Sequence, residues 1–147
     1  MKSFEVEPAD ESRLNQLLSS MSDPRRPLTV DRLVAKWSRF LDELERGYDL
    51  SVYDYTNDLE GRARLEDVLA VLSPTSRDRL KNLLEPLDDR FANQTESAPF
   101  LWGGPRVRWL QRVPKRPGPE LAGDLADMRA KAHQKGGHEG VAKVEGE

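Results

Sequence analysis

The segment between Thr29 and Gly47 constrains the fold more than any other part of the sequence. Its apolar residues recur at helical spacing and fall on one broad stripe, made of Val30, Leu33, Val34, Trp37, Phe40, Leu41 and Leu44. Thr29 suits a helix N-cap, and Gly47 suits the left-handed position that follows a helix. A helix with one apolar face needs other elements to cover that face. We therefore predict a helix over about 29–46 that packs inside a larger helical body.

Four further segments predict helices that complete this body, at about 10–22, 49–60, 62–72 and 74–94. Asp10 can cap the first of them, and Ser73 followed by Pro74 is a typical start for the last. The apolar stripe of the last helix keeps its phase across Pro86, which predicts one helix kinked at that proline. The fold class that follows is all-α: a single compact bundle of about five helices over residues 1–98.

A break is expected between 49–60 and 62–72. Tyr48, Val52, Tyr55 and Leu59 form one apolar stripe, and Leu65, Val68, Leu69 and Leu72 form another. In one continuous helix the two stripes would be rotated by roughly 120° from each other. One straight helix cannot turn both stripes toward one core, and glycine ends or bends a helix at little cost. We place the break near Asp58–Gly61.

The character of the chain changes after Ala98. Residues 99–118 are rich in proline, tryptophan and arginine, which predicts an irregular segment. A short, weakly amphipathic helix is expected over 119–133, and a polar, glycine-rich tail over 134–147 that we expect to be disordered. Residues 1–99 hold 14 basic and 20 acidic side chains, whereas residues 100–147 hold 9 basic and 6 acidic ones.

Two interpretations of this basic segment compete. In the first, its aromatic residues fold back on the helices, and Arg106, Arg108 and Arg112 pair with acidic residues of the body. In the second, Trp102, Trp109 and these arginines form an interaction arm, because aromatic and arginine side chains dominate protein interfaces. We favour packing on the body, since free tryptophans promote aggregation. Weak nucleic-acid binding through Arg106–Arg116 is a further alternative, although the acidic body opposes it.

Composition limits the chemistry available. A chain of 147 residues with 33% charged residues and a net charge of −3 suits one soluble domain. The absence of cysteine removes disulfides, thiolate nucleophiles and cysteine-based zinc sites. No nucleotide-binding, zinc-protease or hydrolase motif is present, so we assign no catalytic, cofactor-binding or metal-binding residues and no cofactor.

The acidic N-terminus and the short apolar runs predict a cytoplasmic protein that does not enter membranes. Twenty leucines without isoleucine, and 16 arginines against 7 lysines, suggest a bacterial source.

The stretch from Tyr48 to Arg62 has the highest density of chemically usable side chains. If it is helical, Tyr48 and Tyr55 face the core while Tyr53 points to solvent. Asp49, Asp54 and Asp58 lie around Tyr53, and Arg62 is placed to neutralise Asp58. This acidic and aromatic surface predicts a module without enzymatic activity that binds a basic protein, for example as an immunity protein, an antitoxin or a regulator. The alternative is a small magnesium enzyme centred on Asp54 and Asp58.

Overall fold

The computed structural model describes residues 4–98 and 107–145, with side chains as far as Ala132. Five α-helices make up most of it, and the prediction of an all-α bundle is confirmed. The α-helices are α1 (Glu11–Met21), α2 (Val30–Glu45), α3 (Val52–Val71), α4 (Pro74–Gln94) and α5 (Pro119–Glu145). The short elements are η1 (Pro8–Asp10), η2 (Arg108–Leu110) and the strands β1 (Thr95–Ser97) and β2 (Arg112–Pro114).

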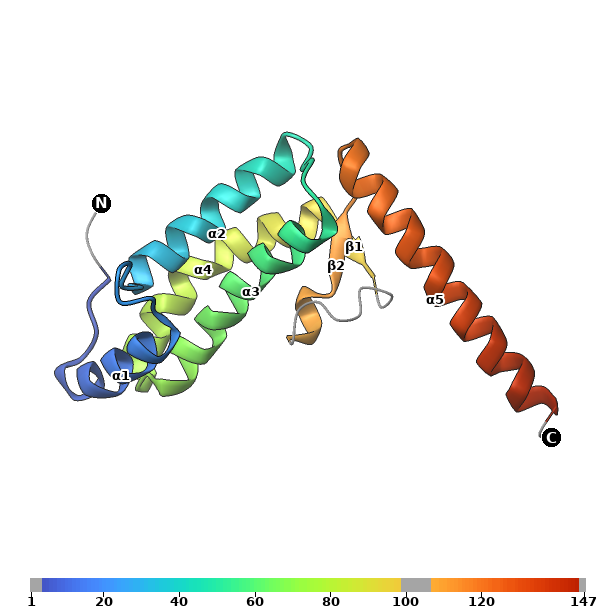
Figure 1. The fold of residues 1–147 in the computed structure, drawn as a ribbon. Helices are drawn as coiled ribbons and strands as arrows, with labels where there is room; N and C mark the ends of the chain where they lie inside the picture. The colour runs from blue at the N-terminus through green and yellow to red at the C-terminus, as the bar shows by residue number, and fades with distance from the viewer. Residues whose placement is uncertain (1–3, 99–106, 146–147) are drawn as a thin grey trace.

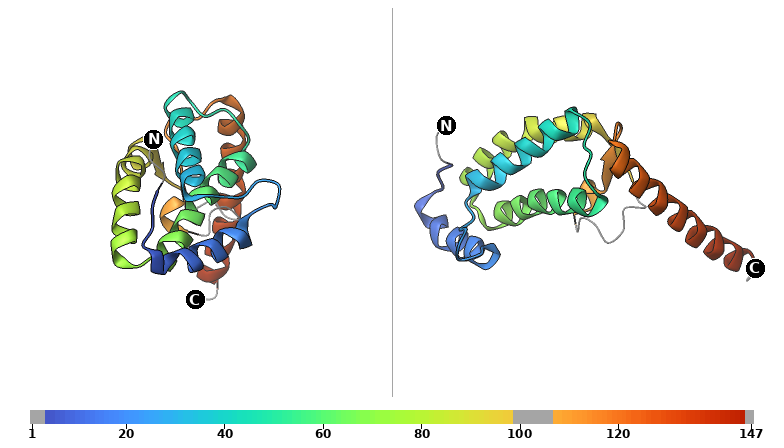
Figure 2. Two further views of the ribbon diagram at one scale, coloured as in Figure 1. Left: turned by 90° about the vertical axis from the view of Figure 1, so that its left-hand side faces the viewer. Right: turned by 45° about the horizontal axis from the view of Figure 1, so that its top comes forward.

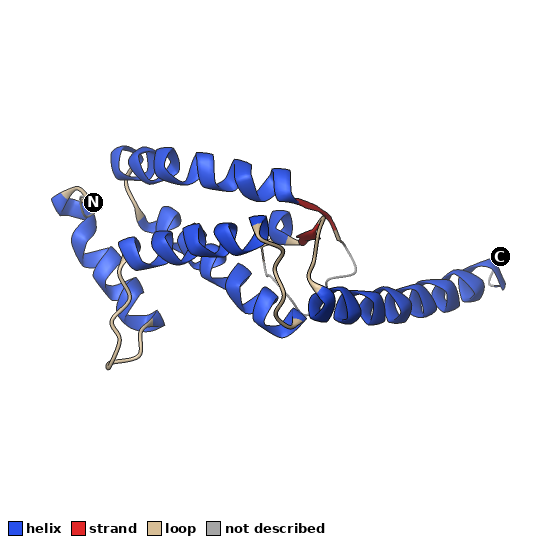
Figure 3. Ribbon diagram, turned by 90° about the horizontal axis from the view of Figure 1, so that it is seen from above, coloured by secondary structure: helices blue, strands red, loops and turns tan. Residues whose placement is uncertain are grey.

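Three helices form the centre of the molecule. Figure 1 shows α2, α3 and α4 running alongside one another, with α1 at one end and the two strands at the other. Figure 2 and Figure 3 show α5 leaving the strand end and extending away from this bundle. Among the described residues, no helix combines the length and the apolar character that a membrane crossing requires.

Helix α2 forms as its sequence predicts. The Thr29 hydroxyl accepts a hydrogen bond from the Arg32 amide at 3.1 Å, and Gly47 has a φ of 91° just beyond the helix. Val30, Leu33, Trp37, Phe40, Leu41 and Leu44 are all buried. Trp37 and Phe40 stack with their ring centroids 5.2 Å apart, and Phe40 also contacts Tyr48 and Tyr55. The face of α2 with the apolar stripe is therefore the centre of an aromatic core.

The predicted break near Asp58–Gly61 is wrong, because α3 is one uninterrupted helix from Val52 to Val71. The two apolar stripes are both buried, but at different heights along the helix. Tyr55, in the first half, lies 5.3 Å from the Tyr48 ring and donates its hydroxyl hydrogen bond to the Arg112 carbonyl at 2.7 Å. The last residue of the helix, Val71, accepts a hydrogen bond from Arg13 of α1. A helix covered by different neighbours along its length does not need a single apolar face.

Helix α4 is continuous through Pro86, as predicted. It begins after Ser73, although that side chain does not cap the helix. Asp10, which we expected to cap α1, makes no cap hydrogen bond there. Its carboxylate instead accepts hydrogen bonds from the Ser73 hydroxyl at 2.7 Å and the Ser73 amide at 3.1 Å. Asp10 therefore joins the start of α1 to the start of α4.

The chain beyond Ala98 departs from its prediction in two places. The expected irregular segment contains the strand β2, which pairs antiparallel with β1 at the end of the helical body, with Glu96 opposite Val113. Leu110 and Val113 are fully buried, and this part of the segment is packed on the helices. Helix α5 continues to Glu145, so the helix expected to end at 133 is too short and the expected disorder of 134–145 is not observed. No proline follows Pro119, and each helical glycine costs only about 1 kcal/mol relative to alanine.

Candidate functional site

Tyr53 lies in the first turn of α3 and is 78% exposed. Ser51 caps this helix: its hydroxyl accepts a hydrogen bond from the Asp54 amide at 3.1 Å and donates one to the Asp54 carboxylate at 2.8 Å. The cap fixes the direction in which the first turn projects its side chains. Leu50, just before the cap, is 45% exposed. We call the exposed residues Asp49, Leu50, Tyr53 and Asp54 the Tyr53 surface.

Helix α5 is attached directly beside the Tyr53 surface by two reciprocal hydrogen bonds. The Asp49 carboxylate accepts a hydrogen bond from the Glu120 amide in the first turn of α5, at 2.9 Å. The Asp124 carboxylate of α5 accepts one from the Val52 amide in the first turn of α3, also at 2.9 Å. Each acidic residue thus satisfies an amide at the N-terminus of the other helix, where negative charge is favoured.

The close approach of the two chains at this junction depends on Gly118. Its amide donates a hydrogen bond to the Tyr48 carbonyl at 2.6 Å. A Cβ atom at position 118 would overlap the Asp49 side chain. The sequence analysis missed the role of Asp124 and Gly118, because their partners lie far away in the sequence. Gly118, placed just before the helix predicted from residue 119, was the one local sign in the sequence that another part of the chain approaches closely here.

Asp58 does not pair with Arg62 as the helical spacing suggests. Its carboxylate is half-buried and accepts a hydrogen bond from the Tyr48 hydroxyl at 2.6 Å. Burial raises the pKa of Asp58 above its usual value, and burial together with the Asp58 charge raises the pKa of Tyr48. Asp58 therefore supports the aromatic core and lies behind the Tyr53 surface.

Arg62 turns inward and is 3% exposed. Its guanidinium donates one hydrogen bond to each carboxylate oxygen of Asp88 in α4, from Nε at 2.9 Å and from Nη2 at 2.8 Å. The same Nη2 atom lies 3.1 Å from Oε1 of Glu66. Asp88 also accepts a hydrogen bond from the Trp37 indole at 3.0 Å. The Arg62 Nη1 atom is buried and has no hydrogen-bond partner. The sequence analysis paired Arg62 with Asp58 because the two residues are four positions apart, a spacing that brings side chains together on a helix surface.

The structure places the predicted tryptophan and arginine site residues in different environments. Trp102 and Arg106 lie outside the described residues, and Arg108 is exposed in η2. Trp109 is 39% exposed, contacts the Phe91 ring at 6.0 Å, and lies 4.9 Å from the Arg62 guanidinium carbon. Arg112 donates hydrogen bonds to the Thr95 side chain and carbonyl, both at 2.8 Å. The expected pairing of Arg112 with acidic residues is thus replaced by contacts that cover the C-terminal end of α4.

A metal site would require several of the carboxylates around these residues to lie close together. In the ranges 4–98 and 107–132, no three histidine, aspartate or glutamate side chains gather where they could hold a metal ion. Asp54 and Asp58, the centre of the magnesium alternative, are each occupied by a hydroxyl group, from Ser51 and Tyr48 respectively. The Tyr53 surface combines two exposed apolar side chains, Leu50 and Tyr53, with the exposed carboxylates of Asp49 and Asp54.

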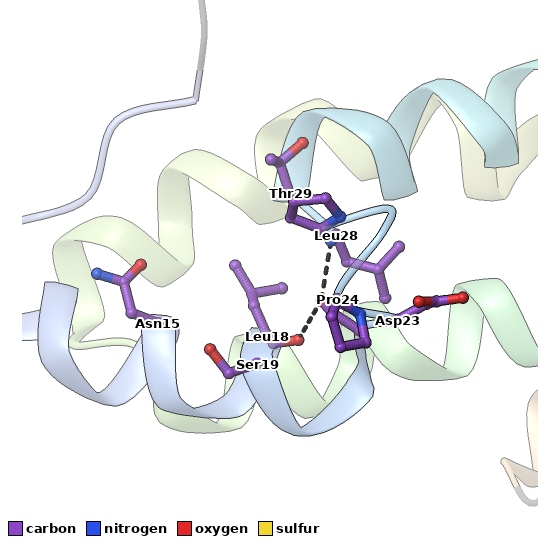
Figure 4. Close-up of a pocket in the computed structure, with 9 residues that line it drawn as sticks. Asn15, Leu18, Ser19, Asp23, Pro24, Leu28 and Thr29 are labelled. Atoms are coloured by element: carbon purple, nitrogen blue, oxygen red, sulfur yellow. Dashed lines mark hydrogen bonds between the residues drawn. The ribbon is translucent and has the colours of Figure 1, made fainter.

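Several hollows lie among the described helices. One of about 480 Å³ lies under the α1–α2 loop, where Ser22 bridges the Leu18 carbonyl and the Leu28 amide (Figure 4). Overlapping hollows of about 390 and 330 Å³ flank the Arg62–Asp88 pair. Another, of about 460 Å³, lies between α2 and α3 and is lined by basic residues.

Comparisons with protein-family models, curated proteins and solved structures found no match to this chain.

Proposed function

We propose that this protein acts by binding another protein through the Tyr53 surface, without catalysis of its own. The observation that carries this proposal is the contrast among the three tyrosines. Tyr48 and Tyr55 are 1% and 0% exposed, whereas Tyr53 is 78% exposed beside the exposed Leu50. A tyrosine presents a large rigid ring and a hydroxyl group at small entropic cost, which suits it to anchor an interface.

The charge of the Tyr53 surface favours a basic partner. Asp49 and Asp54 are exposed on either side of Leu50 and Tyr53. Their hydrogen bonds to Glu120 and Ser51 hold both carboxylates in place, so little side-chain entropy remains to be lost on binding. Complementary charge accelerates association and disfavours acidic competitors. An immunity protein or antitoxin that blocks the basic surface of a toxic partner is the concrete form of this proposal.

Site-specific photo-crosslinking in cells of the source organism tests whether this surface is in contact with a protein. A photoreactive amino acid at position 53 should yield a specific crosslinked protein. The matched control is position 83 on α4, because Leu83 is also exposed, at 49%. Equal crosslinking at both positions, or none at position 53, would contradict the proposal.

Once that protein is identified, binding kinetics give the sharper test. Tyr53→Ala should increase the dissociation rate by about tenfold or more, as expected of an interface anchor. Asp54→Asn should mainly slow association and reduce its dependence on salt. Leu83→Ala is the control and should change neither rate. Wild-type kinetics for Tyr53→Ala in a folded protein would exclude the Tyr53 surface as the binding site.

A further inference from the structure

The hollow between α2 and α3 is strongly basic, although the whole chain has a net charge of −3. Four cationic side chains line its volume of about 460 Å³: Arg32, Lys36, Arg39 and Arg64. Leu28 and Leu33 also line it; Leu28 is partly buried, and Leu33 is 2% exposed. Within the described part of the chain, no aspartate or glutamate lines this hollow. We call it the basic groove.

The backbone places the four cations around one opening. Arg32, Lys36 and Arg39 are spaced by four and three residues, so they follow one face of α2 over about 10 Å. Arg64 reaches the same hollow from α3. The Lys36 stem lies over α3 at Gly61, where a Cβ atom would be 3.9 Å from Lys36 Cδ, an ordinary contact distance.

Ion pairs with the described residues leave these cations largely available, although the Lys36 charge acts on the Asp58 carboxylate and opposes the rise in its pKa. In the part of the chain that the structure describes, Lys36, Arg39 and Arg64 form no salt bridge, and Arg32 donates only to the Pro27 carbonyl through its side chain. Elsewhere arginines are paired: Arg90 binds Asp42 and Glu45, and Arg62 binds Asp88. Like charges repel when they converge, so the groove is a place where an anionic ligand would relieve repulsion.

We propose that the basic groove binds an acidic peptide segment of a partner protein. Guanidinium groups bind carboxylates with two parallel hydrogen bonds, and the partly buried Leu28 offers contact for an apolar residue of such a peptide. Nucleic acid fits these observations less well. A single strand needs aromatic side chains on which its bases stack, and no aromatic residue of the described chain lines the groove. A duplex would extend over neighbouring acidic residues such as Glu43 and Asp31.

Fluorescence anisotropy with a labelled probe tests this proposal on the full chain. The probe is a short fluorescein-labelled peptide that repeats Glu-Glu-Leu, and the same peptide with Gln in place of Glu is its neutral control. The acidic peptide should bind and the neutral one should not. The double substitution Arg39→Gln with Arg64→Gln should weaken binding by about tenfold or more, because each lost charged hydrogen bond is worth at least that factor.

A matched variant controls for net charge. Lys115→Gln with Arg116→Gln removes the same two charges from exposed residues beyond β2, and binding should stay within about twofold of wild type. Equal loss in both variants, or no binding of the acidic peptide, would overturn the proposal. A labelled oligothymidine of equal charge decides the remaining alternative. If it binds more tightly than the peptide and depends on Arg39 and Arg64, the groove is a nucleic-acid site and the peptide proposal fails.

Discussion

Arg62 shows how one residue can be judged wrongly from its neighbours in the sequence. Its charge is almost fully buried, yet two oxygens of Asp88, one of Glu66 and the face of Trp109 surround the guanidinium. A buried charge is tolerated only when such partners replace water. The pair need not add net stability, but it fixes how α3 and α4 are aligned.

Removing one partner of the Arg62–Asp88 pair should lower the free energy of unfolding substantially. Asp88→Ala leaves the Arg62 guanidinium buried without its main partner and removes the acceptor of the Trp37 indole, so we expect a loss of about 3 kcal/mol in the free energy of unfolding. Arg62→Met combined with Asp88→Leu should recover the part of this loss that comes from the buried charge, whereas the Trp37 indole still lacks its acceptor. Urea denaturation of the three proteins measures both effects. A double variant no more stable than Asp88→Ala would contradict this account.

Asp10 provides a second residue-level test, through pH. Hydrogen bonds from Ser73 hold the pKa of Asp10 at about 2, below its usual value of 3.8. A lowered pKa in the folded state means that the carboxylate stabilises the fold above pH 4, and that this stabilisation is lost as the pH falls toward 2.

Asp10→Asn should therefore lower the melting temperature at pH 7, and the difference from wild type should shrink between pH 4 and pH 2. Thermal denaturation followed by circular dichroism over this range measures it. Glu5→Gln is a suitable control, because Glu5 is an exposed acidic residue of the same N-terminal segment. A difference that stays constant down to pH 2 would show that Asp10 acts through packing and not through its charge.

At the scale of elements, α3 is the informative case. Its two apolar stripes are out of phase, yet the helix does not break at Gly61, which is buried and helical. Periodicity describes how a helix would meet one flat core, and it fails for a helix enclosed by neighbours on several sides. The strong stripe of α2 predicted its burial correctly, because α2 presents one face to that core.

The uninterrupted α3 makes Gly61→Ala a stabilising change. Alanine favours the helix by about 0.5–1 kcal/mol over glycine, and the added Cβ would meet Lys36 Cδ at the ordinary contact distance of 3.9 Å. A shift of the urea midpoint to higher concentration, with unchanged slope, is the expected result. Gly47→Ala is the opposing control: Gly47 has a φ of 91°, so that change should destabilise. A destabilised Gly61→Ala would indicate the break that the periodicity predicted.

At the scale of the whole molecule, α5 extends from the bundle and is held at its base. Leu121 and Leu125 are 0% and 2% exposed. The Asp49 carboxylate accepts a hydrogen bond from the Glu120 amide of α5, and the Asp124 carboxylate accepts one from the Val52 amide of α3. The attachment lies beside the Tyr53 surface, so any partner bound there would meet the first turns of α5.

Removing the reciprocal caps should loosen α5 without unfolding the bundle. Asp49→Ala combined with Asp124→Ala should cost about 1 kcal/mol per cap, and faster hydrogen exchange should be confined to the first turns of α3 and α5. Hydrogen exchange measured by mass spectrometry separates these turns from α2, whose exchange should stay unchanged. Asp127→Ala, an exposed acidic residue of α5, is the control. Faster exchange throughout α2 would mean that α5 is part of one cooperative core.

The sequence alone determined the helical character of the segments that form α1, α2 and α4, the burial of Trp37 and Tyr55, and the exposure of Tyr53. These properties depend on local spacing, on caps such as Thr29, and on breakers such as Pro24. Tertiary structure decided the continuity of α3, the inward turn of Arg62, and the partners of Asp10 and Asp49. Asp10 meets Ser73 across 63 positions and Asp49 meets Glu120 across 71. A side chain carries no local sign of a partner so far along the chain, because only packing of the helices brings the two together.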